Sequence, residues 1–196
     1  MQTYVIRRRG IAATVTELDS AMNRLRTFEE RSGTRAARWI RSYALREGDG
    51  RFGLACVFES PDAQALLHHA EQVGLPVEEI VPVAATVLVR PDASQMVHLI
   101  RRRTFWKTAA DLEKSAAISR RIGDEEMSDQ VCWLRTYAVK EQDGTLGTFC
   151  IYQGVSPDAL REHAARVGMP ADEVTQVIGH VVYREDPQPA AERAAA

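Results

Sequence analysis

The chain has 196 residues, of which 45% are hydrophobic and 27% are charged, and its formal net charge at pH 7 is -2. These proportions are those of an ordinary globular protein, and so small a net charge produces no field that would attract nucleic acid or an anionic membrane. The N-terminus has no apolar signal region, and no stretch approaches the ~20 apolar residues of a membrane span. The three cysteines form no CxxC pair, which fits a reducing compartment. We therefore expect a cytoplasmic protein with no nucleic-acid or membrane partner.

The first ninety residues predict four strands and two helices. Their order is strand 3–9, helix 14–32, strand 36–47, strand 51–59, helix 61–73 and strand 80–89. The first helix follows from apolar residues that recur at helical spacing between Leu18 and Phe28. We expect Ser60 to cap the second helix and Gly74 to end it.

The second half of the chain repeats the first. About 27 of the 85 positions from Ile6 to Arg90 are identical to the residue 94 positions later, without a gap. The second copy predicts strand 96–103, helix 108–122, strand 131–141, strand 145–153, helix 156–167 and strand 174–183. So long a period indicates a duplicated domain, because each copy can hold its own core. We therefore expect a first repeat at 1–90, a linker at 91–95, a second repeat at 96–185 and a disordered tail at 186–196.

Each copy has the order βαββαβ of a ferredoxin-like unit. Two helices cover one face of a four-stranded antiparallel sheet, and the bare face must be buried by something. In many small proteins of this type, two such sheets pack face to face as a dimeric α/β barrel. Because both sheets belong to one chain here, we predict an α+β fold in which two ferredoxin-like units pack sheet to sheet as an intramolecular pseudo-dimeric barrel. The molecule would be a monomer or would pair again as a homodimer.

Eight side chains on the central strands are candidates for binding a ligand. They are Trp39, Arg41, Tyr43 and Cys56 in the first copy and Trp133, Arg135, Tyr137 and Cys150 in the second. Strict alternation would place Trp39, Arg41 and Tyr43 on one face, and an arginine flanked by Trp and Tyr in a cavity would bind a carboxylate, a phosphate or an aromatic molecule. The structural alternative is that the two arginines stack on aromatic rings at the barrel mouth and pair with Glu47 and Glu141 or with other acids.

Two histidines occupy the same helical position in the two copies. His69 and His163 lie about 100° from the centre of the apolar helix face, which predicts the edge of the core. A histidine there either donates a hydrogen bond near the helix C-terminus or binds a metal ion. The sequence has no HxH, HExxH or CxxC spacing and no GxGxxG, P-loop or GxSxG motif, so it identifies neither a tight zinc site nor catalytic residues.

The second copy resembles a known family. The resemblance rests on the run Thr148-Phe149-Cys150-Ile151-Tyr152, on Leu160-Arg161-Glu162-His163-Ala164 and on Gly168-Met169-Pro170. These residues resemble the small bacterial family of nickel-responsive, nickel-binding ferredoxin-like proteins, and the similarity extends over 3–90 and 97–184. Family members are usually one unit that dimerises into an α/β barrel, so this chain looks like two units fused.

The resemblance implies a divalent metal ion, nickel, bound between the units. His69 and His163 are the metal-ligand candidates that it carries over. On the second strand the family commonly has a histidine where this chain has Arg41 and Arg135. A guanidinium repels a metal cation, so these arginines would suit an anionic ligand instead.

Two functions from different classes follow. The leading interpretation is a cytoplasmic ligand-binding protein that holds nickel, or a small anionic or aromatic ligand, between its two repeats. The alternative is a cofactor-free enzyme of the dimeric α/β-barrel type, such as an isomerase, a monooxygenase or a decarboxylase, with a His, Tyr or Arg site in the barrel. A third possibility is a module that binds a protein partner through an exposed apolar patch.

Overall fold

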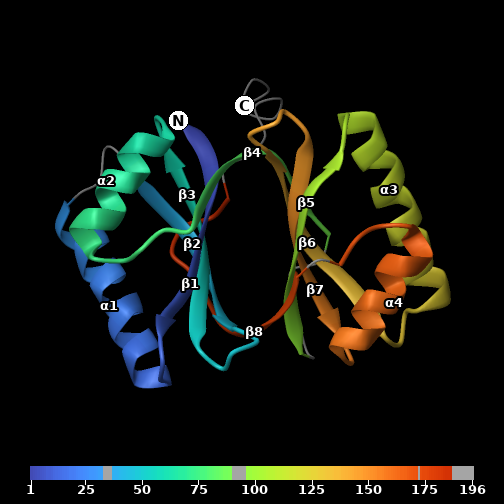
Figure 1. Ribbon diagram of the computed structural model, residues 1–196, viewed down its shortest axis with the longest axis horizontal. Helices are drawn as coiled ribbons and strands as arrows, with labels where there is room; N and C mark the ends of the chain where they lie inside the picture. Colours follow the sequence, from blue (N-terminus) through green and yellow to red (C-terminus); the bar gives the residue numbers. More distant parts are fainter. Residues whose placement is uncertain (33–36, 90–95, 172, 187–196) are drawn as a thin grey trace. The chain divides into compact units, whose positions relative to one another are not determined.

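The computed structural model describes residues 1–32, 37–89, 96–171 and 173–186 (Figure 1). The predicted linker at 91–95 and residues 187–196 of the predicted tail lie outside the described residues. The first repeat forms β1 (Gln2–Ala12), α1 (Val15–Ser32), β2 (Arg38–Arg46), β3 (Phe52–Ser60), α2 (Ala63–Val73) and β4 (Glu79–Leu88). The second forms β5 (Val97–Trp106), α3 (Ala109–Arg121), the π-helix η1 (Ile122–Glu126), β6 (Val131–Lys140), β7 (Leu146–Gly154), α4 (Pro157–Val167) and β8 (Glu173–Val182).

The strands follow one another in a closed antiparallel ring. Their hydrogen-bonded order is β1-β3-β2-β8-β5-β7-β6-β4, which returns to β1. The chain divides into two compact units, Met1–Val83 with Ile178–Ala196, and Ala84–Val177. The division falls inside β4 and β8, so the last strand of each repeat begins in one unit and ends in the other. The predicted α+β class, its two βαββαβ units and its barrel-type ring of strands are confirmed.

The core of the first unit lies between its two helices and one face of its sheet. Helices α1 and α2 lie side by side on this face (Figure 1). Leu18 and Leu25 of α1 point into the core, as their helical spacing predicts, and are buried. The sheet side of the core consists of Phe52, Leu54, Cys56 and Phe58 from β3 with Tyr4 and Ile6 from β1.

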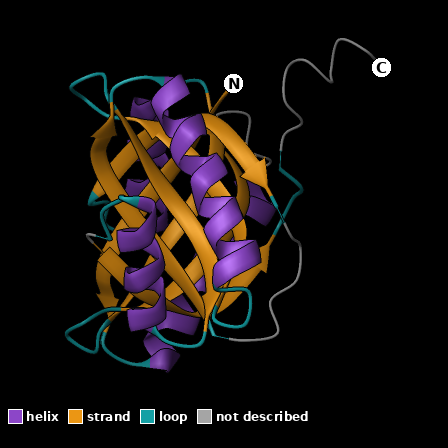
Figure 2. Cartoon of the chain, turned by 90° about the vertical axis from the view of Figure 1, so that its right-hand side faces the viewer, coloured by secondary structure: helices purple, strands orange, loops and turns teal. Residues whose placement is uncertain are grey.

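The second unit has the same layered arrangement. Figure 2 shows its two helices lying across the strands of its sheet. Helix α4 begins as predicted, because the Ser156 hydroxyl accepts a hydrogen bond from the backbone N–H of Ala159. In α2 the cap is Asp62 rather than the predicted Ser60, and its carboxylate accepts from the N–H of Ala65 at 2.8 Å. Asp62 aligns with Ser156 in the repeat, so the same turn is capped by a different side chain.

A β-bulge in β2 alters which side chains share a face. The pairing of β2 with β3 shifts between Trp39 and Arg41, so Ile40 is the extra residue. Trp39 therefore lies on the face of Ser42, and its indole N–H donates to the Ser42 hydroxyl at 2.9 Å. The prediction that Trp39 and Arg41 share a face is wrong, because strict alternation does not allow for an inserted residue. Strand β6 has the same irregularity at the equivalent position.

Candidate functional site

The bulges divide the eight predicted ligand-binding residues between the two faces of the sheets. Those on the helix-covered faces are Trp39, Cys56, Trp133 and Cys150. Those on the opposite faces are Arg41, Tyr43, Arg135 and Tyr137. The predicted Arg–Trp–Tyr constellation is therefore not assembled in either unit.

The glutamates expected to pair with the strand arginines have other partners. Arg41 contacts Asp186, with 2.7 Å between Nη2 and Oδ2. Glu47 instead accepts two hydrogen bonds, both of 2.8 Å, from the Nη2 of Arg7, which is fully buried. The repeat-related pairs are Arg7 with Glu47 and Arg101 with Glu141. Arg41 thus pairs with an acid, Asp186, as the structural alternative allowed, whereas Glu47 and Glu141 bind Arg7 and Arg101.

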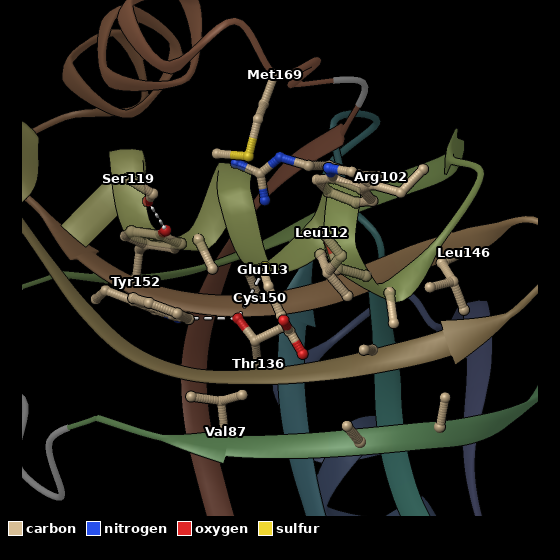
Figure 3. Close-up of a pocket in the computed structure, with 18 residues that line it drawn as sticks. Val87, Arg102, Leu112, Glu113, Ser119, Thr136, Leu146, Cys150, Tyr152 and Met169 are labelled. Atoms are coloured by element: carbon tan, nitrogen blue, oxygen red, sulfur yellow. Dashed lines mark hydrogen bonds between the residues drawn. The ribbon is translucent and has the colours of Figure 1, made fainter. Parts of the chain in front are cut away.

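A cavity of about 260 Å³ lies within the second unit, between α3 and the helix-covered face of the sheet (Figure 3). Helix α3 contributes Leu112, Ala116 and Ser119 to its wall. The strands contribute Val87, Arg102, Trp106, Trp133, Thr136, Thr148, Cys150 and Tyr152. Aliphatic and aromatic side chains dominate this lining and a few polar groups point into it, which is the composition of a site for a small organic molecule.

The first unit keeps a groove at the outer part of this space, lined by Met22, Ser42 and Ala44 among others, but larger side chains fill the inner part. Met22, Leu25 and Leu54 of the first repeat align with Ala116, Ser119 and Thr148 of the second. Leu25 and Leu54 have no exposed surface. In the first unit Tyr183 stacks on Trp39 with ring centroids 4.7 Å apart, whereas the aligned residue in the second unit is the smaller Val89. The inner part of the cavity therefore follows from smaller side chains at aligned positions.

A hydrogen-bonded chain of three residues borders the cavity. The hydroxyls of Ser119 and Tyr152 are 2.9 Å apart, as the dashed line in Figure 3 marks. His163 packs behind them, and its Nε2 lies 3.1 Å from the backbone oxygen of Ser119. Burial raises the pKa of Tyr152 and lowers the pKa of His163. Both groups are thus held neutral near pH 7, and Nε2–H of His163 donates to the carbonyl.

Arg102 is the buried charged residue of the cavity wall, and the sequence prediction did not include it. Its side chain has no exposed surface, and its Nε donates to the backbone oxygen of Pro170 at 2.8 Å. Within the described part of the chain, neither terminal nitrogen of Arg102 has a hydrogen-bond partner. The run Arg101-Arg102-Arg103 could have indicated a buried arginine. In an alternating strand the middle arginine points with Ile100, toward the apolar core.

The two histidines predicted to bind a metal ion are buried, and their imidazole rings contact other groups of the protein. His69 and His163 are 3% and 0% exposed, so the predicted position at the edge of the core is wrong. Nε2 of His69 lies 3.2 Å from Oε1 of Glu29, and the rings of Phe28 and Phe58 meet the imidazole. The first helix of each repeat covers its histidine, which the angle on the histidine's own helix does not reveal.

These residues do not fit a nickel site within either unit. Glu29 also accepts from Arg184 and from the backbone N–H of Trp39. Burial alone would raise the pKa of Glu29, but the hydrogen bonds from His69, Trp39 and Arg184 outweigh it and lower that pKa. Gly123 takes the place of Glu29 in the second repeat. Among the residues described, no group of three or more His, Cys, Asp or Glu side chains could hold a metal ion.

Comparison with known proteins identifies the family. A family model described as nickel responsive protein, SCO4226-like, matches residues 4–83 and again residues 98–177. The chain belongs to the SCO4226-like family. The two matches confirm the predicted tandem duplication of one family unit. No curated protein matches the chain. Among the described residues of this SCO4226-like chain, no helix has the length and apolar character needed to cross a membrane.

Solved structures share the fold of this SCO4226-like chain at low sequence identity. A protein from Lactobacillus acidophilus NCFM, provisionally assigned as a monooxygenase, is 10% identical with a TM-score of 0.53, and the match covers 96% of this chain and 100% of that one. A provisionally assigned monooxygenase from Fusobacterium nucleatum is also 10% identical, with a TM-score of 0.49 and coverage of 94% and 97%. An anthrone oxidase-like protein is 11% identical, with a TM-score of 0.49 and 96% of both chains covered. At this identity the first match shows a common fold and nothing about activity.

Proposed function

We propose that this chain is a cytoplasmic binding protein whose second repeat holds a small, largely apolar organic molecule between α3 and the sheet. The observation that carries the proposal is the cavity of about 260 Å³ in that repeat. It exceeds the ~150 Å³ of an engineered apolar cavity that binds benzene.

The comparison with the first unit supports a ligand. The second unit's cavity reaches the surface, where Glu113 lines it and is exposed. In the first unit a groove also remains at the aligned position, but Leu25 and Leu54 fill its inner part. The second unit lacks these two side chains, so a bound apolar molecule would make contacts there that the first unit makes with its own residues.

The test is binding of one- and two-ring aromatic molecules, neutral and acidic, measured by calorimetry and by quenching of tryptophan fluorescence. Trp106 and Trp133 line the cavity and report on its occupation. Ala116→Met introduces the first repeat's residue into the cavity and should abolish binding. The matched control is Ala117→Met, the same change on the exposed side of α3, which should leave binding unchanged. Equal binding by wild type and Ala116→Met would refute the proposed site.

Nickel is the alternative that the family description requires us to separate from an organic ligand. The same calorimetric experiment with Ni²⁺ on a tag-free preparation, beside His69→Ala/His163→Ala, distinguishes the two. We expect no stoichiometric nickel binding that depends on these histidines, because each is enclosed in the core of its own unit. Stoichiometric nickel that disappears in the double variant would make metal binding the function instead.

A further inference from the structure

The charge on Arg102 defines what the cavity can recognise. A guanidinium is always protonated, and a buried ion without a partner costs several kcal/mol. In the described structure, Nη1 and Nη2 of Arg102 have no hydrogen-bond partner. The residue borders the cavity, but its side chain has no exposed surface, so a ligand reaches these atoms when a neighbouring side chain such as that of Met169 moves. Figure 3 places the Arg102 side chain beside Met169 at the edge of this space. Two adjacent free N–H groups of a guanidinium match the two oxygens of a carboxylate.

A second unpartnered polar group lies next to this guanidinium. Thr148 is directly opposite Arg102 in the pairing of β5 with β7, on the same face of the sheet. Its hydroxyl is buried, lines the cavity and has no hydrogen-bond partner in the described residues. By contrast, the Thr136 hydroxyl in the same wall already contacts the Sγ of Cys150 at 3.0 Å. The free donors therefore converge at one end of the cavity.

No side chain of the cavity wall supplies the missing anion in the described structure. Glu113 also lines the cavity from α3, but it is exposed, and no ion pair joins it to Arg102 among the described residues. The remaining wall near the centre is formed by Leu112, Ala116 and the ring of Trp133, which is stacked near the Tyr152 ring with centroids 6.3 Å apart. A flat apolar body fits between such surfaces.

We infer that the ligand of the second repeat is a small monocarboxylate with an apolar, ring-sized body, whose carboxylate is bound by the terminal nitrogens of Arg102 and the hydroxyl of Thr148. This assignment rests on the proposed function and names its ligand class. The first repeat contains an internal control. Arg8 aligns with Arg102 and is 1% exposed, and Leu54 fills the space beside it in place of Thr148. Arg8 thus has the same charge without access to a ligand.

The first experiment compares phenylacetate with phenylacetamide on the unmodified protein. The two probes share their apolar body and differ in charge. Since charge-assisted hydrogen bonds contribute more than neutral ones, the acid should bind at least about tenfold more tightly than the amide. Equal affinities, both abolished by Ala116→Met, would overturn the carboxylate assignment and leave the proposed function standing. No binding of either probe up to millimolar concentration would overturn both.

The variants then assign the preference to residues. Arg102→Gln should remove the preference for the acid, while Arg8→Gln should retain it, and circular dichroism of both checks that they are folded. A preference retained by folded Arg102→Gln overturns the inference. Thr148→Val has nearly the same shape and should weaken phenylacetate about threefold or more without affecting the amide. If Arg102→Gln does not fold, Thr148→Val and the comparison of the two probes test the carboxylate assignment instead. An unchanged affinity of Thr148→Val for phenylacetate would overturn the role of the hydroxyl.

Discussion

The hydrogen bond between Ser119 and Tyr152 allows a double-mutant test of the cavity. Ser119→Leu with Tyr152→Phe gives the second repeat the side chains of Leu25 and Phe58, which fill the first repeat. Both changes insert or retain apolar atoms and together remove both hydroxyls. We therefore expect the double variant to be more stable than the wild-type protein.

The magnitudes follow from the burial of each group. Burying a leucine side chain contributes about 1.5–3 kcal/mol, but Ser119→Leu alone leaves the buried Tyr152 hydroxyl without its partner at a cost of about 1–3 kcal/mol. The single variant should thus lie within about 2 kcal/mol of wild type. Tyr152→Phe alone should be about 1 kcal/mol less stable. The double variant should gain about 1.5–3 kcal/mol, since neither hydroxyl remains.

Urea unfolding of the four proteins, followed by far-UV circular dichroism at one pH, measures these differences in the free energy of unfolding. The reverse pair in the first repeat, Leu25→Ser with Phe58→Tyr, is the control and should destabilise, because both side chains are fully buried there. A double variant less stable than wild type would show that the space does not accept a leucine side chain and would refute the cavity argument. Additive effects of the two single changes would show that the two hydroxyls do not stabilise each other.

Three further outcomes are expected. Thr104 has a φ of 45°, which strains a β-branched residue, so Thr104→Gly should raise the free energy of unfolding by about 1 kcal/mol in urea titrations, and a loss of stability would contradict this. Burial lowers the pKa of His163, so the unfolded chain takes up the proton at a higher pH than the folded protein does. The free energy of unfolding should therefore fall as the pH drops below about 6.5, by up to ~1.4 kcal/mol per pH unit. Urea midpoints at about pH 7.5, 6.5 and 5.5 for wild type and His163→Gln measure this, and the same dependence of the midpoint on pH in both proteins would refute it. At Gly147 a Cβ would collide with the carboxylate of Glu141 and the guanidinium of Arg101, so Gly147→Ala should break this buried pair and cost about 3–5 kcal/mol, and a near-wild-type melting temperature would exclude the collision.

The sequence specified the order of elements because local patterns are strong in both repeats. Helical spacing of apolar residues and the glycine-containing hairpins suffice for two βαββαβ units. The face assignments failed at Trp39 and Trp133, because a bulge inserts a residue that leaves no mark in the amino-acid pattern. The burial of His69 and His163 was underestimated, because a neighbouring helix covers each of them. The apolar pattern of a single helix does not show which other helix packs against it.

The sequence contains part of the information needed to predict the cavity. Comparison of the two repeats along the first helix shows Leu25 replaced by Ser119, a change from a core residue to a small polar one. Such a loss of volume at an aligned core position predicts either a compensating larger neighbour or an open space. Only the structure shows that no neighbour fills it and that Arg102 faces it.

The strands that pass from one unit to the other also determine when the protein can fold. One edge of β2 pairs with β3 and the other with β8, whose residues are synthesised about 130 positions after β2. Until then the first repeat presents an unpaired strand edge, which is a site for aggregation or for pairing with another nascent chain. Contacts so distant along the chain also slow folding, because the intervening segment must be ordered before they form. The pairing of β2 with β8 therefore forms only after most of the second repeat has been synthesised.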